Sequence, residues 1–184
     1  MFAALRIPEF PLAAVLRRSE NPPDPPRAVA ASEGRQSIIA SVDEEARRQG
    51  VGPGMTTTRA LARCPSLAVL TIDPDAEESA SSWLLALASA ISPRVEFSSG
   101  EAIVDLRGAG DPERAGRRIV RASSGEMDVR VGISDTIERA RWASLRAAPL
   151  FVSVRDEELF GGFPVAEAPL VKPVRGRLLD WGLP

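Results

Sequence analysis

Apolar residues follow two different periods along the chain, and these periods predict both strands and helices. Residues 2–7, 27–31 and 36–41 have the alternation or short apolar runs of strands. From Asp73 onward the period lengthens to three or four residues, which is typical of a helix with one buried stripe. We expect that stripe to consist of Ala80, Leu84, Leu87 and Ile91.

The second half of the chain continues this mixture of elements. Two short apolar segments flank Ser99-Gly100 and predict a hairpin, and Asp111-Pro112 predicts the start of a helix. Without residues 27–72, the order is strand, helix, strand, strand, helix, strand. This is the βαββαβ order of the ferredoxin-like fold, so we expect an α/β (α+β) domain interrupted by a small insert. The expected later elements lie at 94–98, 101–106, 112–121, 129–133, 135–145 and 151–154.

Four arginines stand at helical spacing in the segment after Pro112, and the apolar positions there predict that they point outward. We interpret them as a solvated helix face rather than as a DNA contact. They are Arg114, Arg117, Arg118 and Arg121.

The composition restricts the catalytic and metal-binding side chains that the protein can use. The 184 residues include one cysteine, no histidine and no tyrosine. These counts exclude an intrachain disulfide, a cysteine-based zinc cluster and the usual histidine-activated nucleophiles. Any catalysis would therefore depend on carboxylates and magnesium-type metals.

The charge balance gives no strong attraction for a polyanion, because 23 basic residues stand against 25 acidic ones and the formal net charge is −2. We expect weak, sequence-independent DNA binding, no tighter than about 10⁻⁶ M at physiological salt. No apolar run is long enough to cross a bilayer, which predicts a cytoplasmic protein without a membrane partner.

Several motifs, taken in order, resemble Y-family DNA polymerases. Residues 98–105 resemble the palm motif Ser-Ile-Asp-Glu-Ala-Tyr-Leu-Asp of that family, and residues 45–51 resemble its fingers segment. The resemblance runs from residue 1 to about residue 165. It implies a discontinuous palm, a fingers insert and the beginning of a thumb. The expected boundaries are 1–23 and 72–165 for the palm, 24–71 for the fingers and 166–184 for the thumb.

The metal-binding positions of the family are altered in this chain. The resemblance implies two magnesium ions held by three carboxylates, but Arg6 and Pro8 stand at the first-strand positions and Gly100 replaces the hairpin aspartate. Glu101 alone is kept. A fixed cation repels a metal ion, so we expect no metal, no other cofactor and no enzymatic activity. We also expect Arg6 to form an ion pair with Glu101 or Asp105.

The nucleotide pocket implied by the resemblance is partly kept. Pro11 stands where the family has a ring under the incoming sugar, and Glu44 stands where a tyrosine contacts the triphosphate. Arg47 and Arg141 remain as the two cationic triphosphate contacts.

A kept scaffold with lost acids is similar to ImuB-type proteins, the polymerase-like accessory factors of bacterial mutagenesis cassettes. That resemblance implies a non-catalytic role in translesion synthesis and SOS mutagenesis after DNA damage. The implied partners are an error-prone polymerase, a RecA-like companion and the sliding clamp. Two alternatives are an active nucleotidyltransferase using Glu9, Glu101 and Asp105, and a pure protein-interaction module.

Overall fold

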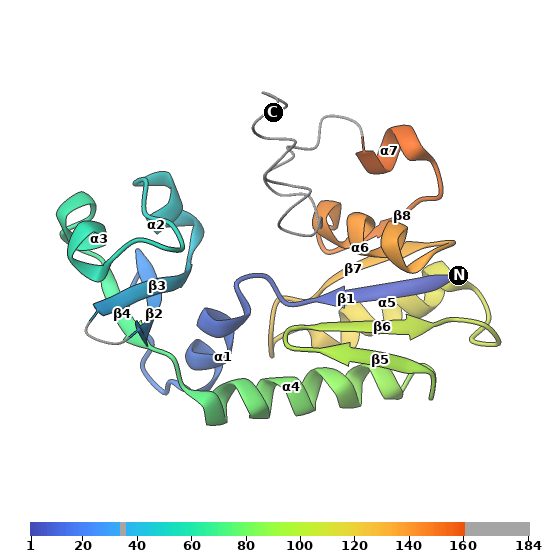
Figure 1. Cartoon of the computed structure of the whole chain (residues 1–184). Coiled ribbons are helices and arrows are strands. Elements are labelled where there is room, and N and C mark those ends of the chain that lie inside the picture. Colours follow the sequence, from blue (N-terminus) through green and yellow to red (C-terminus); the bar gives the residue numbers. More distant parts are fainter. Residues whose placement is uncertain (34–35, 161–184) are drawn as a thin grey trace. The chain divides into compact units, whose positions relative to one another are not determined.

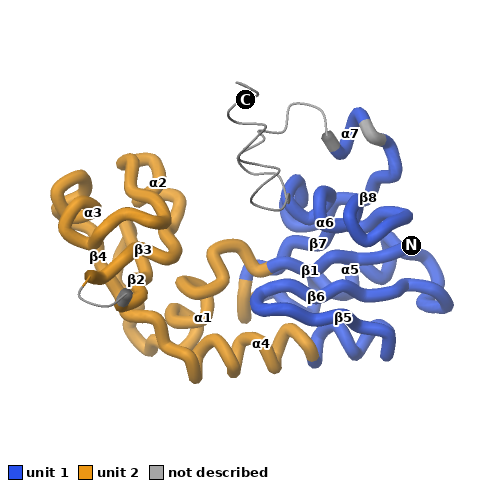
Figure 2. The backbone as a smooth tube through the Cα atoms, viewed as in Figure 1, with its two compact units in different colours: residues 1–6, 86–124, 128–184 blue, residues 7–85, 125–127 orange. Residues whose placement is uncertain are grey.

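The computed structural model describes residues 1–33 and 36–160. The chain divides into two compact units (Figure 2): unit 1 contains residues 1–6, 86–124 and 128 onward, and unit 2 contains residues 7–85 and 125–127. The expected palm and fingers boundaries stay a prediction, and the expected thumb start lies outside the described residues. None of the described helices is both long and apolar enough to span a membrane.

Unit 1 is built on a five-stranded sheet in the order β5-β6-β1-β7-β8 (Figure 1). The central strand β1 pairs antiparallel with β6 and with β7, and β8 adds a parallel edge strand. The strands are β1 (Phe2–Arg6), β5 (Val95–Ser98), β6 (Glu101–Asp105), β7 (Arg130–Ser134) and β8 (Leu150–Val152). The expected ferredoxin-like arrangement is confirmed.

Two helices cover opposite faces of this sheet: α5 (Pro112–Ser123) and α6 (Ile137–Arg146). A Cβ atom on Gly132 would overlap backbone atoms of α6, whereas the Ile133 side chain reaches Gly116 on α5. Neighbouring residues of a strand point to opposite faces, so α6 lies on one side of β7 and α5 on the other. The short helix α7 (Asp156–Phe160) follows β8.

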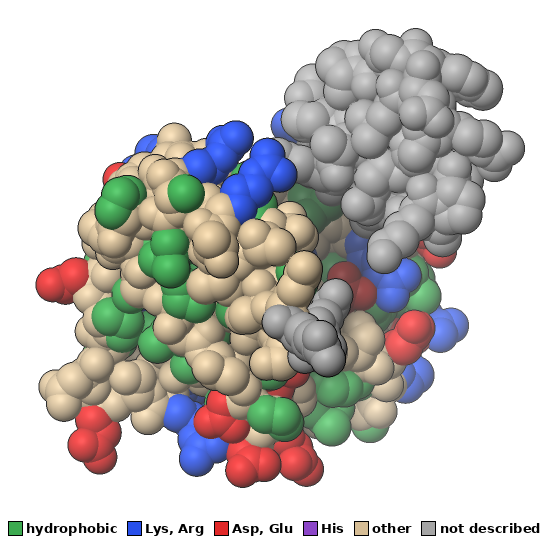
Figure 3. Space-filling model, turned by 60° about the vertical axis from the view of Figure 1, so that its left-hand side comes forward, with side chains coloured by type: hydrophobic (Ala, Val, Ile, Leu, Met, Phe, Trp, Pro, Cys, Tyr) green, Lys and Arg blue, Asp and Glu red, His purple; other side chains and the backbone are tan. Residues whose placement is uncertain are grey.

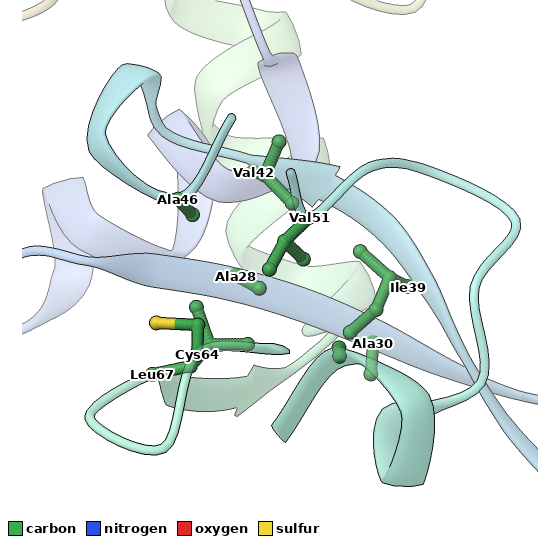
Figure 4. Close-up of a cluster of buried hydrophobic side chains, with 9 residues drawn as sticks. Ala28, Ala30, Ile39, Val42, Ala46, Val51, Cys64 and Leu67 are labelled. Carbon is green, nitrogen blue, oxygen red and sulfur yellow. The ribbon is translucent and has the colours of Figure 1, made fainter. Parts of the chain in front are cut away.

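Unit 2 has its own three-stranded sheet, in the order β3-β2-β4. Its buried cluster is made of small and branched side chains from the strands and from the short helices beside them (Figure 4). The single cysteine, Cys64, is buried in this cluster. The elements are α1 (Phe10–Arg18), β2 (Arg27–Glu33), β3 (Gln36–Val42), α2 (Glu44–Arg48), α3 (Thr57–Arg63) and β4 (Ala68–Thr71).

The long helix α4 (Pro74–Ser89) begins in unit 2 and ends in unit 1. Its fully buried positions repeat every four residues: Ala76, Ala80, Leu84 and Ala88. The predicted stripe is therefore correct at Ala80 and Leu84, but Leu87 is only half-buried and Ile91 lies beyond the helix end. The prediction left out Ala76 and Ala88, although alanine packs closely where a helix lies against a neighbouring element.

The Asp43 side chain links the start of α2 to the first residue of β2, Arg27. Its side chain accepts hydrogen bonds from the backbone N–H of Ala46 at 2.9 Å and of Arg27 at 3.0 Å, and from the Arg27 side chain at 3.0 Å. Burial raises the pKa of Asp43, but these bonds and the Arg27 charge together lower it below the ordinary value. Asp43 therefore caps α2 and also binds Arg27.

Gly132 provides a stability test. In Gly132→Ala the new methyl group would overlap the Ser144 nitrogen and the Ala140 oxygen, so α6 must move away from β7. We expect a loss of at least about 3 kcal/mol in the free energy of unfolding, measured in urea. The matched control is Gly52→Ala, because nothing lies within 4 Å of its added methyl group. A Gly132→Ala protein as stable as this control would contradict the close packing.

A second test follows from the lowered pKa of Asp43. A carboxyl whose folded pKa lies below its unfolded value of about 3.9 stabilises the fold above that pH, and the contribution is lost as pH falls through the folded pKa. We expect Asp43→Ala to cost about 2 kcal/mol at pH 7. The difference in unfolding free energy between wild type and Asp43→Asn should shrink below about pH 4. A difference that is independent of pH would refute the ionised role.

Candidate functional site

The predicted metal positions meet on adjacent strands of unit 1. Arg6 lies directly opposite Glu101 in the β1–β6 ladder and opposite Arg130 in the β1–β7 ladder. Ala4 and Ile103 pack together with α6, so the two-residue period places Arg6 and Glu101 on the same face as that helix. The site is therefore one carboxylate flanked by arginines.

Arg141 of α6 binds the remaining carboxylate. Its Nε lies 2.7 Å from Glu101 Oε1, and its Nη2 lies 3.8 Å from Glu96 of β5. The hydrogen bond that Arg141 donates to Glu101 is the main reason that the pKa of Arg141 is raised. Partial burial opposes this effect, and the charges of Glu101, Glu96 and Glu138 add to it. The sequence analysis missed this ion pair, because forty residues separate its partners and no local pattern links them.

The predicted pairing of Arg6 with Glu101 or Asp105 stays a prediction. Asp105 lies at the other end of β6 from Glu101, next to a shallow pocket of about 270 Å³. Its Oδ2 accepts from Arg107 Nε at 2.8 Å and from Arg94 Nε at 3.0 Å. The hydrogen bonds from Arg107 are the largest cause of a pKa for Asp105 that lies far below its ordinary range. Asp105 is thus part of a structural cluster with two arginines.

Gly100 forms the turn between β5 and β6 with a φ of +74°. L-residues other than asparagine and aspartate rarely adopt this left-handed conformation, whereas glycine adopts it without a steric cost. Glycine at position 100 therefore fits the conformation of the hairpin turn.

In unit 2, Glu9 and Arg47 are the centre of a second charged group. Glu9 Oε2 accepts hydrogen bonds from Ser41 Oγ at 2.8 Å and from the backbone N–H of Val42 at 3.4 Å. Its other oxygen pairs with Arg47, which also binds Glu44 at 3.2 Å. These bonds hold Glu9 in a left-handed conformation, with φ and ψ both 48°. The carboxylate of Glu9 is therefore engaged by the fingers-like part of the chain.

The other two positions predicted from the resemblance are also in unit 2. Pro8 and Pro11 flank the start of α1 and are both half-buried. Neither side chain supplies a metal ligand or an aromatic ring. Arg47 and its two acidic partners are therefore the charged group among these positions of unit 2.

The residues present do not fit the two magnesium ions that the resemblance implies. In the described ranges, no group of three or more His, Cys, Asp or Glu side chains could hold a metal ion. Glu101 already forms an ion pair with Arg141. The residue directly opposite Glu101 in the β1–β6 ladder is Arg6, which is a cation. The alternative set of Glu9, Glu101 and Asp105 is not brought together as a metal-binding group in that part of the chain.

Solved structures share this fold over the whole chain. The insertion ternary complex of Dbh DNA polymerase has a TM-score of 0.82 at 20% identity, and DinB from Sulfolobus solfataricus has a TM-score of 0.80 at 22% identity. The chain covers 58% of each of those proteins. The fold is that of a Y-family DNA polymerase.

Sequence comparison gives the family. The chain belongs to the impB/mucB/samB family, whose model matches residues 7–145. DNA polymerase IV of Pseudomonas fluorescens (strain Pf0-1) is 31% identical over 153 residues, which cover 77% of this chain and 43% of the relative. DNA polymerase IV of Alkaliphilus oremlandii (strain OhILAs) is 32% identical over 136 residues, covering 70% of this chain and 34% of the relative. The chain thus spans less than half the length of either relative.

These relatives correct one expectation. The prediction that the protein is not an enzyme is contradicted, because both relatives are named for an enzyme, DNA polymerase IV. The prediction took the replaced carboxylates as sufficient evidence of lost activity.

A variant with aspartates at positions 6 and 100 tests whether these positions can form a metal site together with Glu101. In the double variant Arg6→Asp, Gly100→Asp, a cation is removed and two carboxylates are added beside Glu101, so repulsion between them favours a bound cation. We expect magnesium to bind this variant at least about tenfold more tightly than wild type in a calorimetric titration. Arg59→Asp, an exposed change in unit 2, is the control for added negative charge. Equal affinity of the double variant and this control would show that the positions do not form a metal site.

Proposed function

We propose that the chain acts in DNA synthesis past damaged template positions, and that its arginines bind the phosphates of an incoming nucleotide. The match of the impB/mucB/samB family model to residues 7–145 carries this proposal. The names of the relatives and of the ternary complex, which are DNA polymerases, support it.

Arg141 has the geometry for phosphate binding in unit 1. Its Nε is used by Glu101, but its two terminal nitrogens form no hydrogen bond within the described residues. Glu96 lies 3.8 Å away, which is an ion-pair distance and too long for a hydrogen bond. The planar guanidinium can therefore offer its remaining N–H groups to a phosphate while Glu101 keeps it oriented.

Arg47 is bound more fully by its own chain. One terminal nitrogen pairs with Glu9 and the other with Glu44. One N–H donor on each terminal nitrogen of Arg47 is thus used by a carboxylate, and both carboxylates compete with a phosphate for this cation. We therefore propose that Arg141 contributes more to triphosphate affinity than Arg47 does.

DNA itself and the protein partners belong to the same proposal. Binding to primer–template DNA should be weak and should fall with rising salt, because it depends on releasing counterions from phosphates. The error-prone polymerase, the RecA-like companion and the sliding clamp stay predicted partners. Co-purification of each with this chain is the direct measurement.

The test is calorimetric binding of a deoxynucleoside triphosphate in magnesium buffer. We expect Arg141→Ala to weaken binding about tenfold, since a charge-assisted hydrogen bond is lost, and Arg47→Ala to have a smaller effect. Glu101→Gln should tighten binding, because it removes the anion that competes with phosphate for Arg141. The matched control is Arg59→Ala, which removes an exposed arginine that forms no ion pair with another described residue.

The proposal fails if wild type shows no triphosphate binding, or if Arg141→Ala and Arg59→Ala bind equally well. If Arg47→Ala weakens triphosphate binding more than Arg141→Ala does, the proposed function stands. The competing role given to Glu9 and Glu44 is then wrong.

A further inference from the structure

Helix α5 presents a row of cations to solvent. Four arginines are exposed at spacings of three and four residues, which places them along one side of the helix. They are Arg114, Arg117, Arg118 and Arg121. The expectation that they point outward is confirmed.

Packing fixes the orientation of this arginine face. The opposite side of α5 is buried through Ala115, Gly116 and Ile119. A Cβ atom on Gly116 would come within 2.7 Å of Leu150 and 2.9 Å of Ile133, so the helix packs closely against the sheet at this point. With this side of α5 buried, the arginine face lies on the surface of unit 1.

The charge of this face is not balanced within the described residues. Arg117 pairs with Glu113, whereas Arg114, Arg118 and Arg121 form no ion pair there. Like charges three or four residues apart destabilise a helix. Arg121 lies in the last turn, where a cation interacts favourably with the helix dipole, but Arg114 and Arg118 have no such compensation.

Several arginines outside α5 are paired with acidic residues. The formal net charge is −2, and arginines such as Arg17, Arg18 and Arg48 each have an acidic partner. On the face shown in Figure 3, basic and acidic side chains occur in separate small groups, and neither sign dominates. An anionic partner at α5 would thus find a local excess of positive charge.

Two observations favour a short acidic peptide over nucleic acid as this partner. From Arg114 to Arg121 a helix extends only about 10 Å, which is enough for a few carboxylates and short for a polyanion. Acidic residues also lie at both ends of the arginine face in the sequence: Asp111 and Glu113 precede it, and Asp128 follows it. A longer phosphate backbone would meet this negative charge at both ends.

We propose that the arginine face of α5 is a docking site for an acidic segment of a partner protein. The face lies on the opposite side of the sheet from Arg141 and Glu101, because α5 and α6 contact neighbouring residues of β7. An acidic segment bound there leaves the proposed phosphate-binding arginine accessible. The inference therefore does not depend on the proposed function.

The test uses the whole chain and a labelled helical peptide of about 14 residues, with glutamates three and four positions apart to match one face of a helix. Its affinity is measured by fluorescence anisotropy. We expect Arg114→Glu, Arg118→Glu to weaken peptide binding at least about tenfold, and excess duplex DNA not to displace the peptide. The charge-matched control is Arg59→Glu, Arg63→Glu on α3, which should change the affinity less than about twofold.

Three results would overturn the proposal. The first is an absence of peptide binding to wild type in low salt, and the second is equal weakening by the α5 and α3 variants, which would indicate a general charge effect. The third is loss of duplex binding in the α5 variant together with displacement of the peptide by DNA, which would assign the face to nucleic acid. Circular dichroism and urea unfolding of each variant separate these results from misfolding.

Discussion

The contact between α6 and β7 at Gly132 determines where the charged side chains of unit 1 meet. Because glycine has no Cβ, the backbone of Ala140 and Ser144 lies directly on the strand. Arg141, between them in sequence, is thereby brought within 2.7 Å of Glu101. A helix held one methyl group further out would move the guanidinium away from its carboxylate. The electrostatics of the candidate site thus depend on an uncharged residue.

The sequence predicted those parts of the fold that depend on local interactions. Asp111 accepts a backbone N–H at the start of α5, so the pair Asp111-Pro112 correctly indicated where this helix begins. Pairings between distant segments were not predictable, because nothing near Glu101 indicates Arg141 and nothing near Glu9 indicates Ser41. The exposed face of α5 was predicted, since its apolar residues fix the buried side. Only the ion pairs of the structure show that, within the described residues, Arg117 is paired and the other three arginines of this face are not.

The candidate phosphate-binding arginines of the two units have similar charged surroundings. In each, an arginine lies near two carboxylates: Arg47 near Glu9 and Glu44, and Arg141 near Glu101 and Glu96. Such pairs are partly exposed and contribute modestly to stability. Their main effect is to orient a long side chain that would otherwise sample many rotamers. Both guanidinium groups are therefore held near carboxylates of their own unit.

The alternation of side chains along β7 has a consequence for how the protein tolerates changes in length. Gly132 faces α6 and Ile133 faces α5, so one added or deleted residue in this strand would exchange the two faces from that point onward. A bulky side chain would then stand where α6 needs bare backbone, and a glycine would leave a gap under α5. The turn at Gly108–Gly110 carries no such constraint, because added Cβ atoms there meet nothing within 4 Å. Length variation within the family should therefore accumulate in that turn and be absent from β7.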